Sequence, residues 1–154
     1  MKALPALLIS LFVAIGGCGI SQSAETNISE TSNKEEVVEI QGKGYELMKS
    51  TCYACHNPNT KSHDEIIAPP HAGIKMRYLR RYRNREDFIK GMSQFLSNPS
   101  EESALMRGAV GKFGLMPKLE LTDSDIQLIV EFIYDNKLEE PDWFAKHSKE
   151  MHGN

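Results

Sequence analysis

Three residues that lie close together in the chain could bind a metal-containing cofactor. The segment Cys52-Tyr53-Ala54-Cys55-His56 places two thiols three positions apart, directly before an imidazole. Two cysteines at this spacing can form thioethers with the two vinyl groups of a haem, and the adjacent histidine then falls beneath the iron. The motif therefore predicts one covalently attached haem, held by Cys52 and Cys55 and ligated through Nε2 of His56.

The same residues could serve other chemistry. A thioredoxin-like redox pair would need a βαβ setting, and no such pattern surrounds the motif. A zinc site could recruit Cys52, Cys55, His56 and His63, but their spacing fits no common zinc module. A structural disulfide across two intervening residues would be strained. Haem attachment is the interpretation that we prefer.

A methionine far along the chain is the candidate for the second axial ligand. Met116 lies in a predicted loop that contains three glycines, Gly108, Gly111 and Gly114, and it precedes Pro117. Glycines let the backbone approach a ligand closely, and the proline biases Met116 towards an extended conformation. A thioether opposite a histidine raises the reduction potential of the iron and closes it to external ligands. We expect His56 and Met116 to be the two metal ligands.

Helices must position these residues, and the pattern predicts no strand. The first helix runs from about Lys34 into the motif, the second covers residues 85–97, and Asn98 caps a short third helix. The last begins at Thr122, which resembles a capping box with Asp125. Five residues form the apolar face of the first helix: Val37, Ile40, Gly44, Leu47 and Met48. These faces are too small for a self-sufficient core, so we expect a large flat cofactor in the middle.

Together these features resemble the class I monohaem c-type cytochromes, over about residues 36 to 137. The resemblance rests on Gly44, the haem motif, Ala68-Pro69-Pro70, Leu115-Met116-Pro117 and Leu121-Thr122. It implies an all-α, cytochrome c-like fold in which the first and last helices cross at Gly44 and Phe132, around a covalently bound haem, with loops and short helices between. It also implies that the carbonyl of Pro69, or failing that Pro70, accepts a hydrogen bond from Nδ1 of His56.

The N-terminus has the pattern of an export signal. A short basic start precedes an apolar stretch at residues 3–15, which is too short to cross a hydrocarbon core of ~30 Å. The following Ile15-Gly16-Gly17-Cys18 resembles the lipobox of bacterial lipoproteins. We expect residues 1–17 to be removed and Cys18 to be lipidated; the alternative is an ordinary signal peptide with Cys18 incidental.

The predicted organisation of the mature chain has three parts. Residues 18–35 are polar and are predicted to form a flexible tether. Residues 36–140 form the haem domain. Residues 141–154 form a tail with a mobile end, in which Trp143 and Phe144 could pack back onto the domain. The protein is thus expected to be exported and anchored to a bacterial membrane by lipid, in the periplasm or on the outer cell surface.

Composition and charge limit the partners. The chain has 154 residues and a formal net charge of −3, which suits one domain and excludes a general nucleic-acid binder. One segment is strongly basic: Lys75, Arg77, Arg80, Arg81, Arg83 and Arg85. It could be a solvated helical face, a docking patch for an acidic redox partner, or a set of partners for the haem carboxylates.

The function that we expect is one-electron transfer by a membrane-tethered carrier. No catalytic acid or base is apparent, so the chain is not predicted to be an enzyme or to bind a small-molecule substrate. Two alternatives stay open. One is a gas-sensing or peroxidase-like haem domain with a displaceable sixth ligand, and the other is a small cytochrome subunit of a larger oxidoreductase complex.

Overall fold

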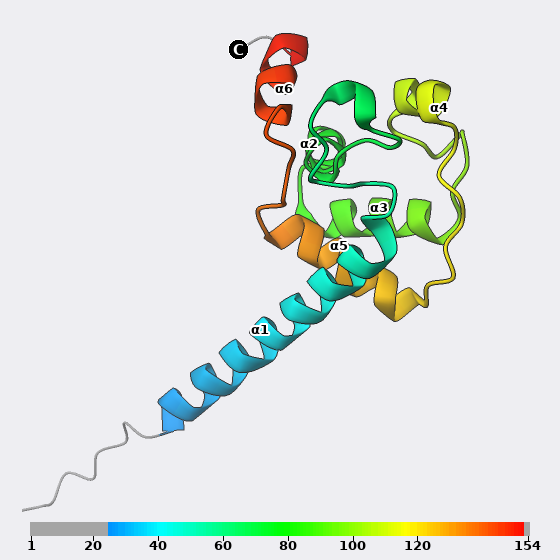
Figure 1. The fold of residues 1–154 in the computed structure, drawn as a ribbon. Coiled ribbons are helices and arrows are strands. Elements are labelled where there is room, and N and C mark those ends of the chain that lie inside the picture. The colour runs from blue at the N-terminus through cyan, green and yellow to red at the C-terminus, as the bar shows by residue number, and fades with distance from the viewer. Residues whose placement is uncertain (1–24, 153–154) are drawn as a thin grey trace, which may run out of the picture.

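The computed structural model describes the backbone of residues 25–152 and side chains between residues 36 and 151. Within that range the chain forms helices joined by irregular segments and contains no strand, so the predicted all-α class is confirmed (Figure 1). The elements are α1 (Glu25–Cys52), η1 (His63–Glu65), α2 (His71–Arg81), α3 (Arg85–Ser97), α4 (Arg107–Phe113), α5 (Asp123–Asp135) and α6 (Phe144–His152). The predicted signal peptide, Cys18 and the start of the tether lie outside the described residues.

Helix α1 is longer than predicted and projects from the rest of the molecule (Figure 1). It begins at Glu25, nine residues before Lys34, so the second half of the predicted flexible tether is helical. Starting a helix is costly, but extending one adds a hydrogen bond for each residue that is ordered, which lets polar residues continue a helix anchored elsewhere. The buried face also starts later than predicted, since Val37 is 52% exposed. No helix within residues 25–152 has the length and hydropathy needed to cross a membrane.

Helices α1 and α5 cross at the predicted glycine. A Cβ atom on Gly44 would lie 2.8 Å from the Cβ of Phe132 and closer still to the carbonyl oxygen of Leu128. Only a residue without a side chain permits this approach. The crossing holds the end of α1, and hence the haem motif, against the C-terminal half of the domain.

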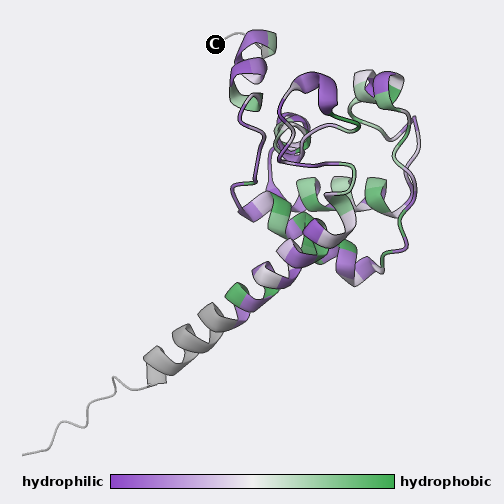
Figure 2. Ribbon diagram, viewed as in Figure 1, coloured by the Kyte–Doolittle hydropathy of each residue, from purple (hydrophilic) through white to green (hydrophobic). Residues whose placement is uncertain are grey.

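The core lies where α1, α3 and α5 meet, and hydrophobic residues gather there (Figure 2). Helix α3 has the predicted bounds, and its first turn is capped by Asn84, whose side chain accepts a hydrogen bond from the Asp87 amide. The predicted capping box at the start of α5 is confirmed, with Thr122 and Asp125 bonded reciprocally. The buried core residues are Met48, Tyr78, Phe88, Met92, Ile126, Ile129, Val130, Ile133 and Leu138.

The prediction of a short helix capped by Asn98 is wrong. The backbone amide of Asn98 donates to the carbonyl of Gln94, so this residue ends α3 and does not begin another helix. A turn follows, held by hydrogen bonds between Ser100 and Ser103. The short helix is α4, which lies further along the chain and includes two of the glycines expected in a loop, Gly108 and Gly111.

The C-terminal tail packs against the domain through Trp143 and Phe144, as predicted. The indole Nε1 of Trp143 donates to the carbonyl oxygen of Thr60 at 3.1 Å, and Phe144 is buried beside Gly73. These contacts order the segment that follows, and α6 extends to His152, where a mobile end was predicted.

Candidate haem site

The haem motif forms a tight turn at the C-terminal end of α1. The backbone amides of Cys55 and His56 both donate to the carbonyl oxygen of Cys52, at 3.1 and 2.8 Å. These bonds use a carbonyl that the end of the helix would otherwise leave without a partner. As a result, Cys52, Cys55 and His56 all line one cavity.

The ring of His56 is oriented by the backbone of the loop that follows. Its Nδ1 lies 2.6 Å from the carbonyl oxygen of Pro69, the contact that the resemblance implied. A carbonyl can only accept, so Nδ1 carries the proton and Nε2 keeps its lone pair for a metal. Burial lowers the pKa of His56, which favours the neutral form that a metal ligand requires.

Met116 reaches the same cavity from a distant part of the chain. Helix α4 ends at Gly114, whose positive φ of 83° is a conformation that residues with side chains avoid. The chain then runs through Leu115, Met116 and Pro117 to α5. Leu115 is exposed, whereas Met116 is half-buried and lines the cavity with Cys52, Cys55 and His56.

The cavity has a volume of about 280 Å³ and walls that are mainly apolar. Helices α2, α3, α4 and α5 all contribute to it. The apolar lining residues include Ile74, Tyr78, Met92, Phe95, Leu96, Leu105, Met106, Val110, Phe113, Ile129 and Ile133. Two thiols, an imidazole and a thioether within an apolar enclosure match the chemistry of a covalently attached haem, so the residues present fit the group.

Comparison with known proteins agrees with this site. The family model of cytochrome c matches residues 42–137, which include the motif, Pro69 and Met116. The chain belongs to the cytochrome c family. It therefore binds haem c covalently and takes part in haem-based electron transfer, as a member of a family of electron carriers whose domains are typically exported.

One relative of this cytochrome is an uncharacterized protein of Aquifex aeolicus (strain VF5). The two chains are 27% identical over 128 residues, which span 72% of this chain and 82% of the relative. No solved structure matches the chain.

Sequence reasoning missed most of the wall that α4 supplies. Met106, Ala109, Val110 and Phe113 recur at spacings of three, one and three and all line the haem cavity. That spacing is typical of one helix face, but the neighbouring glycines made the segment look like a loop. Packing against the site offsets the cost of about 1 kcal/mol that each glycine adds to a helix.

A second histidine, His71, lies against the ring of His56. The ring centroids of His56 and His71 are 4.7 Å apart, and His71 is buried at the first position of α2. Burial, with a smaller contribution from the neighbouring His56, lowers the pKa of His71 to about 3. His71 is therefore an uncharged packing partner for the His56 ring at neutral pH.

The basic segment of this cytochrome is not simply a solvated helical face. Lys75 Nζ donates to the carbonyl oxygens of Tyr134 and Asn136, at 2.8 and 2.7 Å, at the C-terminal end of α5. Arg77 Nε donates to the carbonyl oxygen of Leu105 at 2.9 Å. Arg85 forms a bidentate pair with Asp135. Half of the segment thus joins α2 and α3 to other elements, although Arg77 and Arg85 are also exposed to solvent.

Proposed function

We propose that this cytochrome is a monohaem, class I electron carrier in which His56 and Met116 are the axial ligands of the iron. The observation that carries the proposal is that both residues line one apolar cavity with Cys52 and Cys55. A haem with two protein ligands keeps the same ligands when the iron is oxidised and reduced. Reorganisation is then small, and no coordination position is left for a substrate.

The same proposal includes a membrane anchor at Cys18. It is supported by the lipobox-like residues 15–18 and by the export that is typical of cytochrome c domains. The 28 residues of α1 correspond to about 42 Å of helix, of which the N-terminal part is a stem and the C-terminal part packs in the domain. A lipidated Cys18, seven residues before this helix begins, would tether the haem domain to the membrane while it meets a donor and an acceptor.

Replacing Met116 by Ala tests the ligand assignment. Loss of the thioether should lower the reduction potential by on the order of 0.1 V or more, within the ~0.8 V range that axial ligands span. The reduced variant should also bind carbon monoxide, which the wild type should not. Absorption spectra and a potentiometric titration measure both effects. Met106→Leu is the control, since Met106 lines the same cavity and should leave spectrum and potential unchanged.

Two results would count against the proposal. An unaltered spectrum in Met116→Ala would mean that another residue is the sixth ligand. Rapid binding of carbon monoxide to the untreated reduced wild type would favour the gas-sensing or peroxidase-like alternative.

Mass spectrometry of the mature protein tests the anchor. The expected mass includes one haem and the acyl chains of a lipidated N-terminal Cys18, and Cys18→Ala should move the haem-loaded protein from the membrane to the soluble fraction. A mature wild type without lipid would show that the signal is an ordinary one. Co-purification with a larger oxidoreductase would identify the carrier as a subunit.

A further inference from the structure

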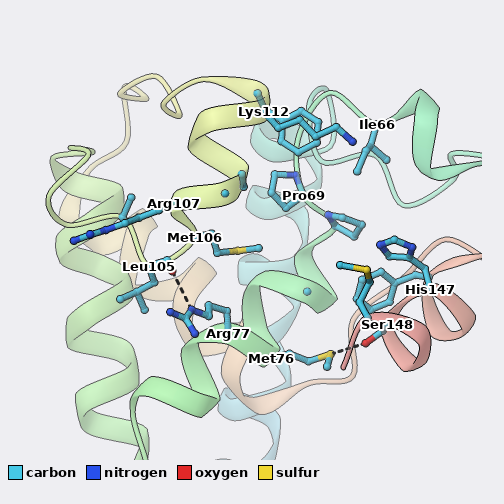
Figure 3. Close-up of a pocket in the computed structure, with 18 of the residues that line it drawn as sticks. Ile66, Pro69, Met76, Arg77, Leu105, Met106, Arg107, Lys112, His147 and Ser148 are labelled. Carbon is cyan, nitrogen blue, oxygen red and sulfur yellow. Dashed lines mark hydrogen bonds between the residues drawn. The ribbon is translucent and has the colours of Figure 1, made fainter. Parts of the chain in front are cut away.

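A second and larger cavity lies beside the haem cavity. Its volume is about 920 Å³, and it opens between α2, α4 and α6. Figure 3 shows Arg107 and Lys112 of α4 on one side, Arg77 and Met76 of α2 below, and His147 and Ser148 of α6 on the other side. We call it the basic cavity.

The basic cavity concentrates positive charge in a chain whose net charge is −3. Five of the 18 lysines and arginines line it: Arg77, Arg80, Arg81, Arg107 and Lys112. All five are exposed at the mouth, and Glu102 is the one exposed acidic residue among the lining residues. A haem carries two carboxylates. Even if both were paired here and Glu102 paired with a third cation, two of the five charges would lack a counterion, so the mouth can attract a further anionic surface.

The floor of the basic cavity is apolar and adjoins the haem cavity. It is formed by half-buried residues such as Met76, Leu105 and Phe113. Six residues line both cavities: Pro69, Ala104, Leu105, Met106, Ala109 and Phe113. These shared residues are what separates a partner seated at the mouth from the haem cavity. Electron transfer slows steeply with distance, so this position suits a redox partner.

The walls of the cavity are held in place by contacts between distant segments. Arg77 Nε bonds the carbonyl oxygen of Leu105, which joins α2 to the segment before α4. On the other side, the Ser148 hydroxyl lies 3.9 Å from the sulfur of Met76 (Figure 3). Trp143 anchors the start of α6 to Thr60. A site that is already formed loses less entropy on binding.

We infer that the basic cavity is the docking site for an acidic, one-electron redox protein. Carboxylates of the partner would face Arg80, Arg81, Arg107 and Lys112, and an apolar side chain would contact the floor. This inference rests on the proposed electron-carrier function. It adds which surface of this chain the partner binds and which charge the partner carries. Charges at the rim of an interface act mainly on the rate of encounter, and they do so in a salt-dependent manner.

The test measures transfer of one electron from the reduced, haem-loaded cytochrome to oxidised plastocyanin, an acidic copper protein used as the probe. Two double variants reverse the charges of one helix each: Arg80→Glu with Arg81→Glu on α2, and Arg107→Glu with Lys112→Glu on α4. The control pair, Lys90→Glu with Lys137→Glu, changes the net charge equally, and neither residue lines the cavity. At low ionic strength each cavity pair should lower the second-order rate constant about tenfold or more, within the range that steering spans. The control pair should lower it less than threefold.

Three outcomes would overturn the inference. Equal slowing by all three pairs would show that only net charge matters. A shift in reduction potential in the cavity pairs, with little change in rate, would assign these cations to the haem carboxylates. A wild-type reaction that is insensitive to salt would show that no docking occurs. Benzoquinone, a small neutral oxidant, separates these results from failure of the proposed function, because a working carrier should react with it equally in all variants.

Discussion

At the scale of single residues, the haem site contains two histidines in contact, and the structure distinguishes their roles. His56 Nδ1 lies 2.6 Å from the carbonyl oxygen of Pro69, which leaves the Nε2 lone pair available for the proposed bond to iron. His71 lies against the face of that ring and also contacts Tyr53, with a centroid distance of 5.8 Å. Burial lowers the pKa of both imidazoles, and for His71 the neighbouring His56 adds a smaller effect, so burial is the main reason that both rings are neutral.

Replacing His71 by Leu should make the stability of the protein less sensitive to acid. The pKa of His71 is about 3 in the folded state against 6.5 for the free side chain, so between these values the unfolded state binds the extra proton. Its contribution to the free energy of unfolding is therefore present above pH 6.5 and declines as the pH falls, by up to ~1.4 kcal/mol per unit.

Urea denaturation at pH 7 and pH 5 measures this effect. The wild type should lose up to about 2 kcal/mol of stability over that interval through His71, and His71→Leu should lose correspondingly less. His56, whose pKa burial also lowers, is retained in both proteins and so cancels in the comparison. If both proteins lose the same stability between pH 7 and pH 5, the pKa of His71 does not differ between the folded and unfolded states.

At the scale of elements, one crossing between helices sets the geometry of the site. Gly44 lets α1 lie directly on α5, and the motif follows at the end of the same helix. The capping box fixes the N-terminal end of α5. Lys75 donates hydrogen bonds to two carbonyl oxygens at the C-terminal end of the same helix. The motif is thus attached to the half of the domain that follows Met116.

Two neighbouring glycines of α1 provide a matched test of this crossing. Gly44→Ala should lower the free energy of unfolding by about 1–3 kcal/mol, the usual cost of overpacking, because its new Cβ would meet Phe132 and the backbone of Leu128. Gly42→Ala should raise it by roughly 0.5–1 kcal/mol, since no atom lies within 4 Å of its Cβ and alanine favours helix. Thermal or urea unfolding gives both values, and the same sign for both variants would contradict the crossing.

At the scale of the whole molecule, the haem cavity is where the helices converge. Only a small set of core residues is fully buried, and many apolar residues of α2, α3, α4 and α5 line the cavity as well. Burial of apolar surface contributes about 25 cal/mol per Å², so contact between these walls and the haem is a major part of the stability of the domain.

Removing both cysteines that form thioethers should therefore affect folding as well as haem attachment. Cys52→Ala with Cys55→Ala should abolish covalent haem and leave an apoprotein with reduced helix content and no cooperative unfolding transition. Circular dichroism and urea titration measure this, and Cys18→Ala is the control that should retain haem and fold. A double variant that is free of haem and unfolds as cooperatively as the wild type would show that the protein packs independently of its cofactor.

The sequence by itself determined the features that depend on short-range chemistry. Thioether attachment needs only the spacing of Cys52, Cys55 and His56, and the capping box of Thr122 and Asp125 consists of hydrogen bonds within one turn. The bounds of α3 follow from its apolar period and its terminal residues. The role of Gly44 was also predictable, although through resemblance to a family and not through local physics.

Only the tertiary structure decided the features that depend on contacts between distant segments. Lys75 donates a hydrogen bond to the carbonyl oxygen of Tyr134 at the end of α5. Arg77 donates to the carbonyl oxygen of Leu105, and Trp143 to that of Thr60. These partners are 28 to 83 residues away in the chain. The glycines of α4 become helical because the helix packs on the haem cavity, and the basic cavity exists because α2, α4 and α6 meet. Local propensity does not specify which surfaces come together, since that choice follows from burial summed over the whole chain.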